Sequence, residues 1–299
     1  MSDALFRPPW TFGEPYSDSN TLESARIVVL PVPYDSTTEY KGGAREGPRA
    51  IVDASQYLEL YDAELGQETG AIGIYTLPEV QPLVGDPQNM IERVQRVVGD
   101  LLEKDKLVAM LGGEHSLTAG AVRAFAERYP GLSVLHLDAH ADLRDDYMGT
   151  RYSHACVARR VWETCHIVQA GVRSLSKDEH DFIRAQGLLS YDAEAAAQTG
   201  FGESLASHLH EDIYISIDLD VLDPSIMAAV GTPEPGGLTW QQLTSLLKAV
   251  AQTKRIVGFD LVELSPSQGT ESCAYLAAKL AYKLMGYATL RSPRSPDNG

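Results

Sequence analysis

Carboxylate and imidazole side chains follow two apolar runs of the sequence at alternate positions. They are Asp138, His140 and Asp142 after the first run, and Asp218 and Asp220 after the second. Side chains two positions apart on an extended chain point the same way, so each set can face one site at the end of a buried strand. Oxygen-rich ligands with some imidazole suit Mn²⁺, with Zn²⁺, Fe²⁺, Co²⁺ or Ni²⁺ as substitutes. The two sets therefore predict metal chemistry.

A third group comes from Gly112-Gly113-Glu114-His115, where an apolar strand turns into a helix. A lone histidine after such a turn is commonly an ordinary loop residue, but the five ligands above make His115 the expected sixth. Two histidines and four aspartates are too many for one tetrahedral ion, and the absence of cysteine from this set argues against a structural zinc site. Four carboxylates balance the charge of two divalent cations. The sequence thus predicts a binuclear centre.

Five further residues accompany these groups, and each has a catalytic and an ordinary interpretation. Glu263, just past a strand, can hold a cation or join a salt bridge between loops. His154 can serve as an acid or base or simply start a helix. Glu114 can support the neighbouring ligand or cap the helix that begins there. His136 is expected to be a packed core histidine rather than a ligand, and Asp260 to have a structural role.

Short apolar runs alternate with segments of helical period along most of the chain. The expected strands are residues 26–30, 72–75, 107–111, 132–138, 167–171, 188–189, 213–219 and 256–262. The expected helices are residues 48–61, 87–104, 116–129, 154–162, 175–187, 200–210, 239–252 and 271–287, with a loop over most of 64–86. This alternation predicts an α/β fold, a three-layer α/β/α sandwich with a mainly parallel sheet. The carboxyl ends of its strands share one edge, where such folds place their sites.

Length and composition predict one large globular domain. The chain has 299 residues, of which 44% are hydrophobic and 22% charged, and these are globular values. We expect an N-terminal extension over 1–24, a single domain over 25–289 and a polar tail over 290–299. No apolar run is long enough to cross a bilayer, and the N-terminus has neither the basic start nor the apolar core of a signal peptide. The expected location is the cytoplasm.

The charge balance limits the classes of partner. A formal net charge of -16 disfavours nucleic acid, whose phosphates require clustered Lys and Arg. It suits a small cationic substrate, although such a charge more often serves solubility. The cysteines Cys156, Cys165 and Cys273 have neither disulfide-framework nor metal-site spacing, and we expect them to be free thiols in a reducing compartment.

The chain resembles the ureohydrolase (arginase and agmatinase) family over about residues 26–285. The matching motifs, in order, are Gly112-Gly113-Glu114-His115-Ser116, Asp138-Ala139-His140-Ala141-Asp142, Ser153-His154, Ser216-Ile217-Asp218-Leu219-Asp220-Val221-Leu222-Asp223-Pro224 and Gly258-Phe259-Asp260-Leu261-Val262-Glu263. Several spaced motifs in the right order make this resemblance specific. It implies the arginase-like α/β/α fold and assembly as a homo-oligomer, a trimer or hexamer.

The resemblance also implies two Mn²⁺ per chain and a role for each polar group. The first ion would be held by His115, Asp138, Asp142 and Asp218, and the second by Asp138, His140, Asp218 and Asp220. A hydroxide that bridges the ions would attack the guanidinium carbon of the substrate. Glu263 would bind the guanidinium by charge-assisted hydrogen bonds, and His154 would shuttle a proton that helps the amine to leave as urea is released.

The loop 143–153 bears on the substrate, because arginases hold the α-carboxylate and amine of arginine with an Asn- and Ser-bearing loop before the catalytic histidine. Here the loop lacks the Asn and is more similar to that of agmatinases. The expected substrate is therefore agmatine, hydrolysed to putrescine and urea in polyamine biosynthesis. Residues 155–157 differ from the Gly-Thr common at that point in agmatinases. Guanidinobutyrate, guanidinopropionate, arginine or a formimino compound therefore stay open, with Arg144 or Arg151 as carboxylate partners.

Two alternatives from other classes also stay open. The chain could be a catalytically silent subunit that binds or regulates, although all six ligand positions are intact. Deacetylases share the general fold, but their metal site is mononuclear and lacks the doubled aspartate set. A metal count near two per chain would exclude the deacetylase interpretation.

Overall fold

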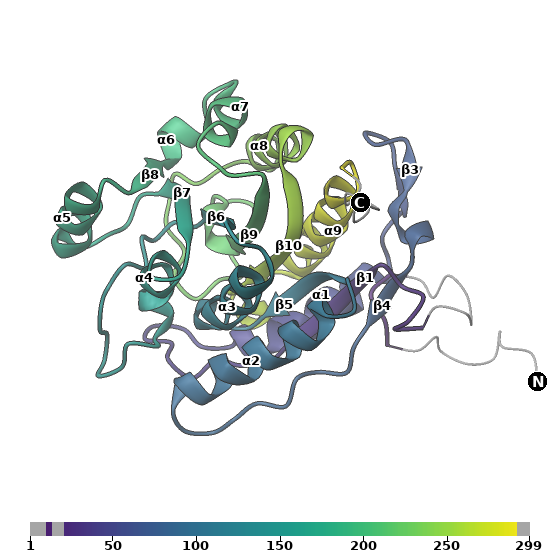
Figure 1. The fold of residues 1–299 in the computed structure, drawn as a ribbon, viewed down its shortest axis with the longest axis horizontal. Coiled ribbons are helices and arrows are strands. Elements are labelled where there is room, and N and C mark those ends of the chain that lie inside the picture. Colours follow the sequence, from purple (N-terminus) through teal and green to yellow (C-terminus); the bar gives the residue numbers. More distant parts are fainter. Residues whose placement is uncertain (1–9, 14–20, 292–299) are drawn as a thin grey trace, which may run out of the picture.

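An eight-stranded sheet runs through the chain (Figure 1). The computed structural model describes residues 10–13 and 21–291. The strands of the sheet are β1 (Ile27–Val32), β4 (Ile74–Thr76), β5 (Leu107–Gly112), β6 (Ser133–Leu137), β7 (His166–Val172), β8 (Leu189–Asp192), β9 (Asp212–Asp218) and β10 (Arg255–Val262). They lie in the order β4-β1-β5-β10-β9-β6-β7-β8, and each neighbouring pair is parallel. The predicted α/β fold is confirmed, with a wholly parallel rather than mainly parallel sheet.

Nine α-helices connect these strands in the described part of the chain. They are α1 (Gly47–Ser55), α2 (Pro87–Leu102), α3 (Thr118–Arg128), α4 (Val157–Trp162), α5 (Lys177–Gln186), α6 (Ala193–Ala196), α7 (Phe201–Ala206), α8 (Trp240–Thr253) and α9 (Glu271–Ala288). Two of their beginnings are set by local chemistry. Ser176 with Glu179, and Thr239 with Gln242, form capping boxes before α5 and α8, which satisfy backbone N–H groups that a helix leaves unpaired.

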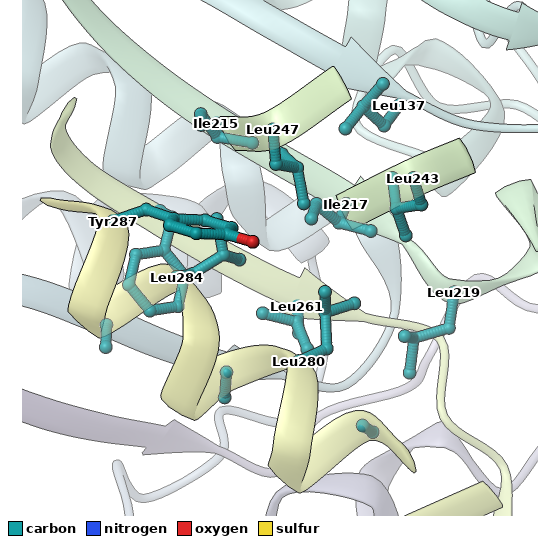
Figure 2. Close-up of a cluster of buried hydrophobic side chains, with 14 of the residues drawn as sticks. Leu137, Ile215, Ile217, Leu219, Leu243, Leu247, Leu261, Leu280, Leu284 and Tyr287 are labelled. Atoms are coloured by element: carbon teal, nitrogen blue, oxygen red, sulfur yellow. The ribbon is translucent and has the colours of Figure 1, made fainter. Parts of the chain in front are cut away.

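Both faces of the sheet are buried. Side chains alternate between the faces along a strand, so Ile27 and Val29 join one hydrophobic cluster while Val28 and Leu30 join another. Helices α1, α7, α8 and α9 contribute to the first cluster and α2, α3 and α4 to the second, which gives three layers. Figure 2 shows leucine and isoleucine side chains of β9 and β10 packed against α8 and α9. This two-sided burial holds the strands whose ends carry the polar groups.

The order of the strands brings distant parts of the sequence to one place. The chain passes from β5 to β6 and leaves two positions between them, which β9 and β10 later fill. Because all four strands are parallel, their carboxyl ends meet at the middle of one edge. Ligands in open α/β sheets bind beyond the carboxyl ends of the strands, where the strand order changes direction. The topology therefore places the ends of β5, β6, β9 and β10 around one site.

Some predicted boundaries are wrong. The helix expected over 48–61 ends at Ser55, whose hydroxyl donates to the Val52 carbonyl and accepts from the Gly13 N–H. The expected loop over 64–86 overlaps a small antiparallel hairpin, β2 (Tyr61–Asp62) with β3 (Gln67–Glu68). These differences arise because tertiary hydrogen bonds, rather than local periodicity, decide where the short elements stop.

The chain ends lie largely outside the described residues. Within the predicted extension over 1–24, residues 10–13 pack on the domain: Trp10 Nε1 donates to Asp53 Oδ1 at 2.9 Å, and Phe12 is buried in the core. Residues 1–9, 14–20 and 292–299, which include most of the predicted tail, are not described, so the division at 25–289 stays a prediction. None of the described helices combines the length and apolar character that crossing a bilayer requires.

A buried ion pair attaches the β2–β3 hairpin to α9. Lys283 Nζ donates to Asp62 at 2.8 Å and to Glu64 at 2.5 Å, and Tyr287 donates to the same Glu64 oxygen at 2.9 Å. Although burial alone would raise it, the hydrogen bonds from Lys283 and Lys248 lower the pKa of Glu64 to about 2. Because this folded-state pKa lies below the ordinary 4.5, the stabilisation is present above pH 4.5 and is lost as the pH falls towards 2.

We expect Lys283→Met to lower the free energy of unfolding by roughly 3 kcal/mol, because it leaves the buried Asp62 carboxylate without its cation. The expected loss, measured by urea denaturation at pH 7, should shrink below pH 4.5. The matched control is Lys279→Met one turn earlier in α9, whose ammonium donates to the exposed Glu59 carbonyl and lies over the Tyr282 ring, 5.9 Å from its centroid. Equal effects of the two substitutions would contradict the assigned role of the ion pair.

Candidate active site

The six predicted ligands and Glu263 gather at the carboxyl ends of the central strands. His115 opens a short 3-10 helix directly after β5, and Asp138 follows the last residue of β6. Asp218 is the last residue of β9, and Glu263 follows β10 directly. Each strand therefore delivers its polar group at the same edge of the sheet, as the sequence predicts.

One set of ligands surrounds the His115 imidazole. Its Nδ1 lies 3.0 Å from Asp138 Oδ2, 3.3 Å from Asp218 Oδ2 and 3.6 Å from Asp142 Oδ2. A second set surrounds His140, whose Nδ1 lies 2.9 Å from Asp220 Oδ2 and 3.5 Å from Asp138 Oδ1. The two oxygens of Asp138 thus face different imidazoles, so this carboxylate is shared by both sets.

The position of Asp218 in this pair of sets is less symmetrical. Its Oδ2 faces His115, while its Oδ1 accepts the backbone N–H of Asp220 at 2.8 Å. The contacts place Asp218 with the first set. A bridging role for Asp218, which the resemblance implies, stays a prediction.

The residues fit divalent metal ions. Burial, and then the charge of Asp138, raise the pKa of Asp142 well above its usual range, and burial followed by the charge of Asp220 does the same for Asp218. Such crowded buried carboxylates are unfavourable unless cations compensate them. His115 Nδ1 and Asp138 Oδ2 are also buried without a hydrogen-bond partner of good geometry. Two adjacent cations, one in the set around His115 and one in the set around His140, would therefore stabilise these carboxylates.

His136, predicted to be a packed core histidine, packs directly against this cluster. Its ring stacks on that of His115, with centroids 4.7 Å apart, and its Nε2 lies 3.6 Å from Asp138 Oδ2. Burial lowers the pKa of His136 to about 3, so the imidazole is neutral. The ligand atoms of His115, His136, Asp138 and Asp142 all lie within 4.8 Å of one another, so His136 is also close enough to share a metal ion with these residues.

Two residues of the site adopt the left-handed backbone region. The φ angles of Asp142 and Glu263 are 51° and 66°, which L side chains rarely adopt and which cost of order 1–3 kcal/mol each. The turn after β10 brings the Glu263 carboxylate beside the His115 backbone, whose N–H it accepts at 2.6 Å. Burial, and then the charge of Glu114, raise the pKa of Glu263 to about 8. A bound cation would therefore stabilise the ionised form of this carboxylate as well.

A pocket of about 580 Å³ opens onto the cluster. Its lining includes His140, Asp142, Asp218, His154 and Glu263. Burial, and then repulsion from His115, lower the pKa of His154 to about 4, so its imidazole is neutral at neutral pH and can accept a proton. The two predicted catalytic residues thus face the same cavity as the metal ligands.

The residues that hold these groups in place are not among those predicted from the sequence. Arg173, just past β7, donates to the carbonyls of Asp220, Glu234 and Pro235 and so fixes the loops that follow β9. The Thr37 hydroxyl contacts two nitrogens of His154, the backbone N–H and the ring Nδ1. The sequence does not predict which carbonyl groups an arginine at the end of a strand will bind. The position of Arg173 at a strand end was the only signal.

A buried chain of hydrogen bonds orients His115. Its Nε2 lies 2.9 Å from Ser216 Oγ, and that hydroxyl donates to Asp260 Oδ1 at 2.7 Å. The other Asp260 oxygen accepts from Tyr214 and Thr118 at 2.7 and 2.9 Å. Because the Ser216 proton is used by Asp260, its oxygen accepts from Nε2–H, which leaves Nδ1 free for the metal cluster.

We expect Asp260→Asn to weaken binding of the divalent ions about 10–100-fold, since an amide N–H₂ must then face a hydroxyl that was donating. The measurement is calorimetric titration of metal-stripped protein. Tyr214→Phe removes one donor to Asp260 but keeps the bond from Ser216, and should change the affinity little. Unchanged affinity in Asp260→Asn would contradict the orienting role.

Comparison with known proteins agrees with this geometry. The Arginase family matches residues 25–286. The chain is 39% identical to the N(1)-aminopropylagmatine ureohydrolase of Thermus thermophilus, over 94% of this chain and 95% of that protein. It is 32% identical to the agmatinase of Bacillus cereus, over 82% and 86% of the two chains. The solved structure of the agmatine ureohydrolase of Thermoplasma volcanium superimposes with a TM-score of 0.85 at 32% identity, and the match covers 95% of this chain and 96% of that one.

These matches span nearly the whole chain, and the relatives named here are ureohydrolases, so they favour a ureohydrolase over a deacetylase or a silent subunit. The structure adds a buried site of histidines and aspartates in two adjacent sets. The chain therefore belongs to the arginase family, as an agmatinase-like ureohydrolase with a binuclear metal site.

Proposed function

We propose that the enzyme releases urea from a cationic guanidino compound, with agmatine as the first candidate substrate. The observation that carries this proposal is the position of Glu263. Its carboxylate lines the pocket beside the metal ligands and has a raised pKa. One of its oxygens accepts a hydrogen bond from the His115 N–H. A planar guanidinium can donate to the remaining lone pairs by charge-assisted hydrogen bonds.

His115, Asp138, His140, Asp142, Asp218 and Asp220 would hold the two ions. Two divalent ions, for which we propose Mn²⁺, would supply Lewis acidity and so lower the pKa of a water molecule towards neutrality. Glu263 binds and orients the guanidinium. The neutral His154 accepts a proton at Nε2 as water adds to the guanidinium carbon, and passes it on to the departing amine. Assembly as a trimer or hexamer and a cytoplasmic location stay predictions.

A distal ammonium on the substrate would find carboxylate partners in the pocket. Glu39 and Glu234 line it, as do the cations of Lys41 and Arg144, and Glu39 accepts a hydrogen bond from Tyr147. Arg151 is not in the pocket lining and pairs with Asp145 at 2.9 Å, so it is a poor partner for a substrate carboxylate. Arg144 does line the pocket, and its guanidinium lies over the Tyr147 ring.

N1-Aminopropylagmatine is the second candidate substrate. It carries one further ammonium group beyond the agmatine unit, and the Thermus thermophilus relative is named for it. The carboxylates that line the pocket suit this group as well as they suit the single ammonium of agmatine.

The test is urea release by Mn²⁺-loaded protein from agmatine, N1-aminopropylagmatine, arginine, guanidinobutyrate, guanidinopropionate and guanidine, with metal-stripped protein as control. We expect one of the two amines to exceed every guanidino acid in kcat/KM by at least about tenfold, because Glu39 and Glu234 attract a terminal ammonium and repel a terminal carboxylate, while the Arg144 guanidinium is stacked on the Tyr147 ring. Preference for an acid would overturn the substrate assignment. Absence of urea from all six with two metals bound would overturn the proposed reaction.

A further inference from the structure

The Nδ1 atom of the His154 ring faces two hydroxyl groups. Its Nδ1 lies 3.2 Å from Thr37 Oγ1 and 3.3 Å from Ser153 Oγ. The backbone N–H of His154 donates to the same Thr37 oxygen at 3.0 Å. Which ring nitrogen carries the proton depends on whether these hydroxyls donate or accept.

The Thr37 hydroxyl is held by a fully buried carboxylate. Thr37 Oγ1 donates to Glu114 Oε1 at 3.0 Å, and the backbone N–H groups of Ser36 and Thr37 donate to Oε2 at 2.6 and 2.7 Å. The Ser116 hydroxyl donates to Oε1 as well. All four partners of Glu114 are donors, so it acts as an acceptor. Glu114 therefore ties the loop after β1 to the turn after β5, and makes no side-chain cap to the helix there.

The backbone around this carboxylate is packed too closely to shift. The Glu114 N–H donates to the Tyr34 carbonyl at 2.8 Å. A Cβ atom on Gly113 would lie 1.9 Å from that same carbonyl oxygen, so only glycine allows the two loops to approach this closely. The position of Thr37 relative to the metal-binding turn is thereby fixed.

We infer that Glu114 and Thr37 are positioning residues that hold His154 in its Nδ1–H tautomer, with Nε2 free to exchange a proton with the substrate. A threonine hydroxyl has one proton and two lone pairs. Glu114 takes the proton, the His154 backbone N–H takes one lone pair, and the other lone pair faces Nδ1. Only a protonated Nδ1 satisfies that contact. The inference rests on the proposed catalytic role of His154, but the tautomer itself can be measured without turnover.

The experiment is ¹⁵N NMR of the histidine rings in full-length protein loaded with diamagnetic Zn²⁺, with the His154 signals assigned from their loss in His154→Gln. In the unaltered protein we expect the Nδ1–H pattern for His154. Thr37→Val keeps the shape but removes the hydroxyl, and should shift His154 towards Nε2–H. With Mn²⁺, the same substitution should lower kcat roughly tenfold to a hundredfold with little change in KM, since proton transfer by one side chain contributes about 10²–10⁴.

Two further variants separate positioning from folding. Thr37→Ser restores the hydroxyl and should restore both the tautomer and kcat. Ser153→Ala removes the other hydroxyl near Nδ1 and should leave both unchanged. An Nε2–H pattern in the unaltered protein, a larger effect of Ser153→Ala than of Thr37→Val, or failure of Thr37→Ser to recover kcat would overturn the inference. Full urea release by His154→Gln would instead overturn the proposed catalytic role and leave the tautomer assignment standing.

Discussion

Replacing Asp138 with asparagine is expected to reduce metal binding and urea release by more than about a hundredfold. Residues that merely orient a metal ligand contribute about 10–100-fold to affinity or activity, so loss of a ligand that serves both sets should cost more. Asp138 presents one oxygen 3.0 Å from His115 and the other 3.5 Å from His140. Asparagine keeps the shape but removes the charge and one of these oxygens. Elemental analysis of bound metal and urea release across a Mn²⁺ titration measure the effect.

A matched substitution elsewhere controls for nonspecific effects. Asp86 caps α2 by accepting the Gln88 N–H at 3.0 Å, and asparagine caps a helix about as well as aspartate. Asp86→Asn should therefore retain metal content and activity. An Asp138→Asn protein with two ions per chain and full activity would contradict the shared-ligand assignment and with it the binuclear mechanism.

Replacing Glu263 with glutamine should lower kcat/KM by about 10²–10³-fold while the metal content stays unchanged. Loss of one partner from a buried charge pair costs about 2–5 kcal/mol, and each 1.36 kcal/mol is tenfold in rate. The glutamine oxygen can still accept the His115 N–H, which Glu263 accepts at 2.6 Å, so the metal-binding turn keeps its support. Steady-state urea release and metal stoichiometry, measured on the same preparation, separate the two roles.

The control for this substitution is Glu127→Gln at an exposed position, where the carboxylate accepts a hydrogen bond from Gln95. It should behave as the unaltered protein. Retained kcat/KM in Glu263→Gln would show that another group binds the guanidinium. Loss of both ions would show that Glu263 acts on the structure of the site rather than on the substrate.

The ligand positions were readable from the sequence because their geometry follows from two regularities. Side chains at 138 and 140, two positions apart, can face the same way on extended chain, Asp142 follows as the chain turns into a loop, and parallel strands end at one edge of the sheet. The helices with strong period and caps, such as α2 and α8, also match their predicted ranges closely. Weakly periodic segments do not match their predicted ranges. The end of α1 at Ser55 and the position of the β2–β3 hairpin are determined by hydrogen bonds to residues far away in the sequence.

The sequence by itself determined the family, the parallel α/β architecture, and the set of histidines and aspartates at the strand ends. The tertiary structure decided which atoms meet: that Asp138 faces two imidazoles, that Asp260 reaches His115 through Ser216, and that Arg151 is outside the pocket lining. Local patterns encode where a side chain leaves the backbone, because strand and helix periods are short. Hydrogen bonds such as that of Thr37 to His154, 117 positions apart, depend on loop conformations that no period encodes.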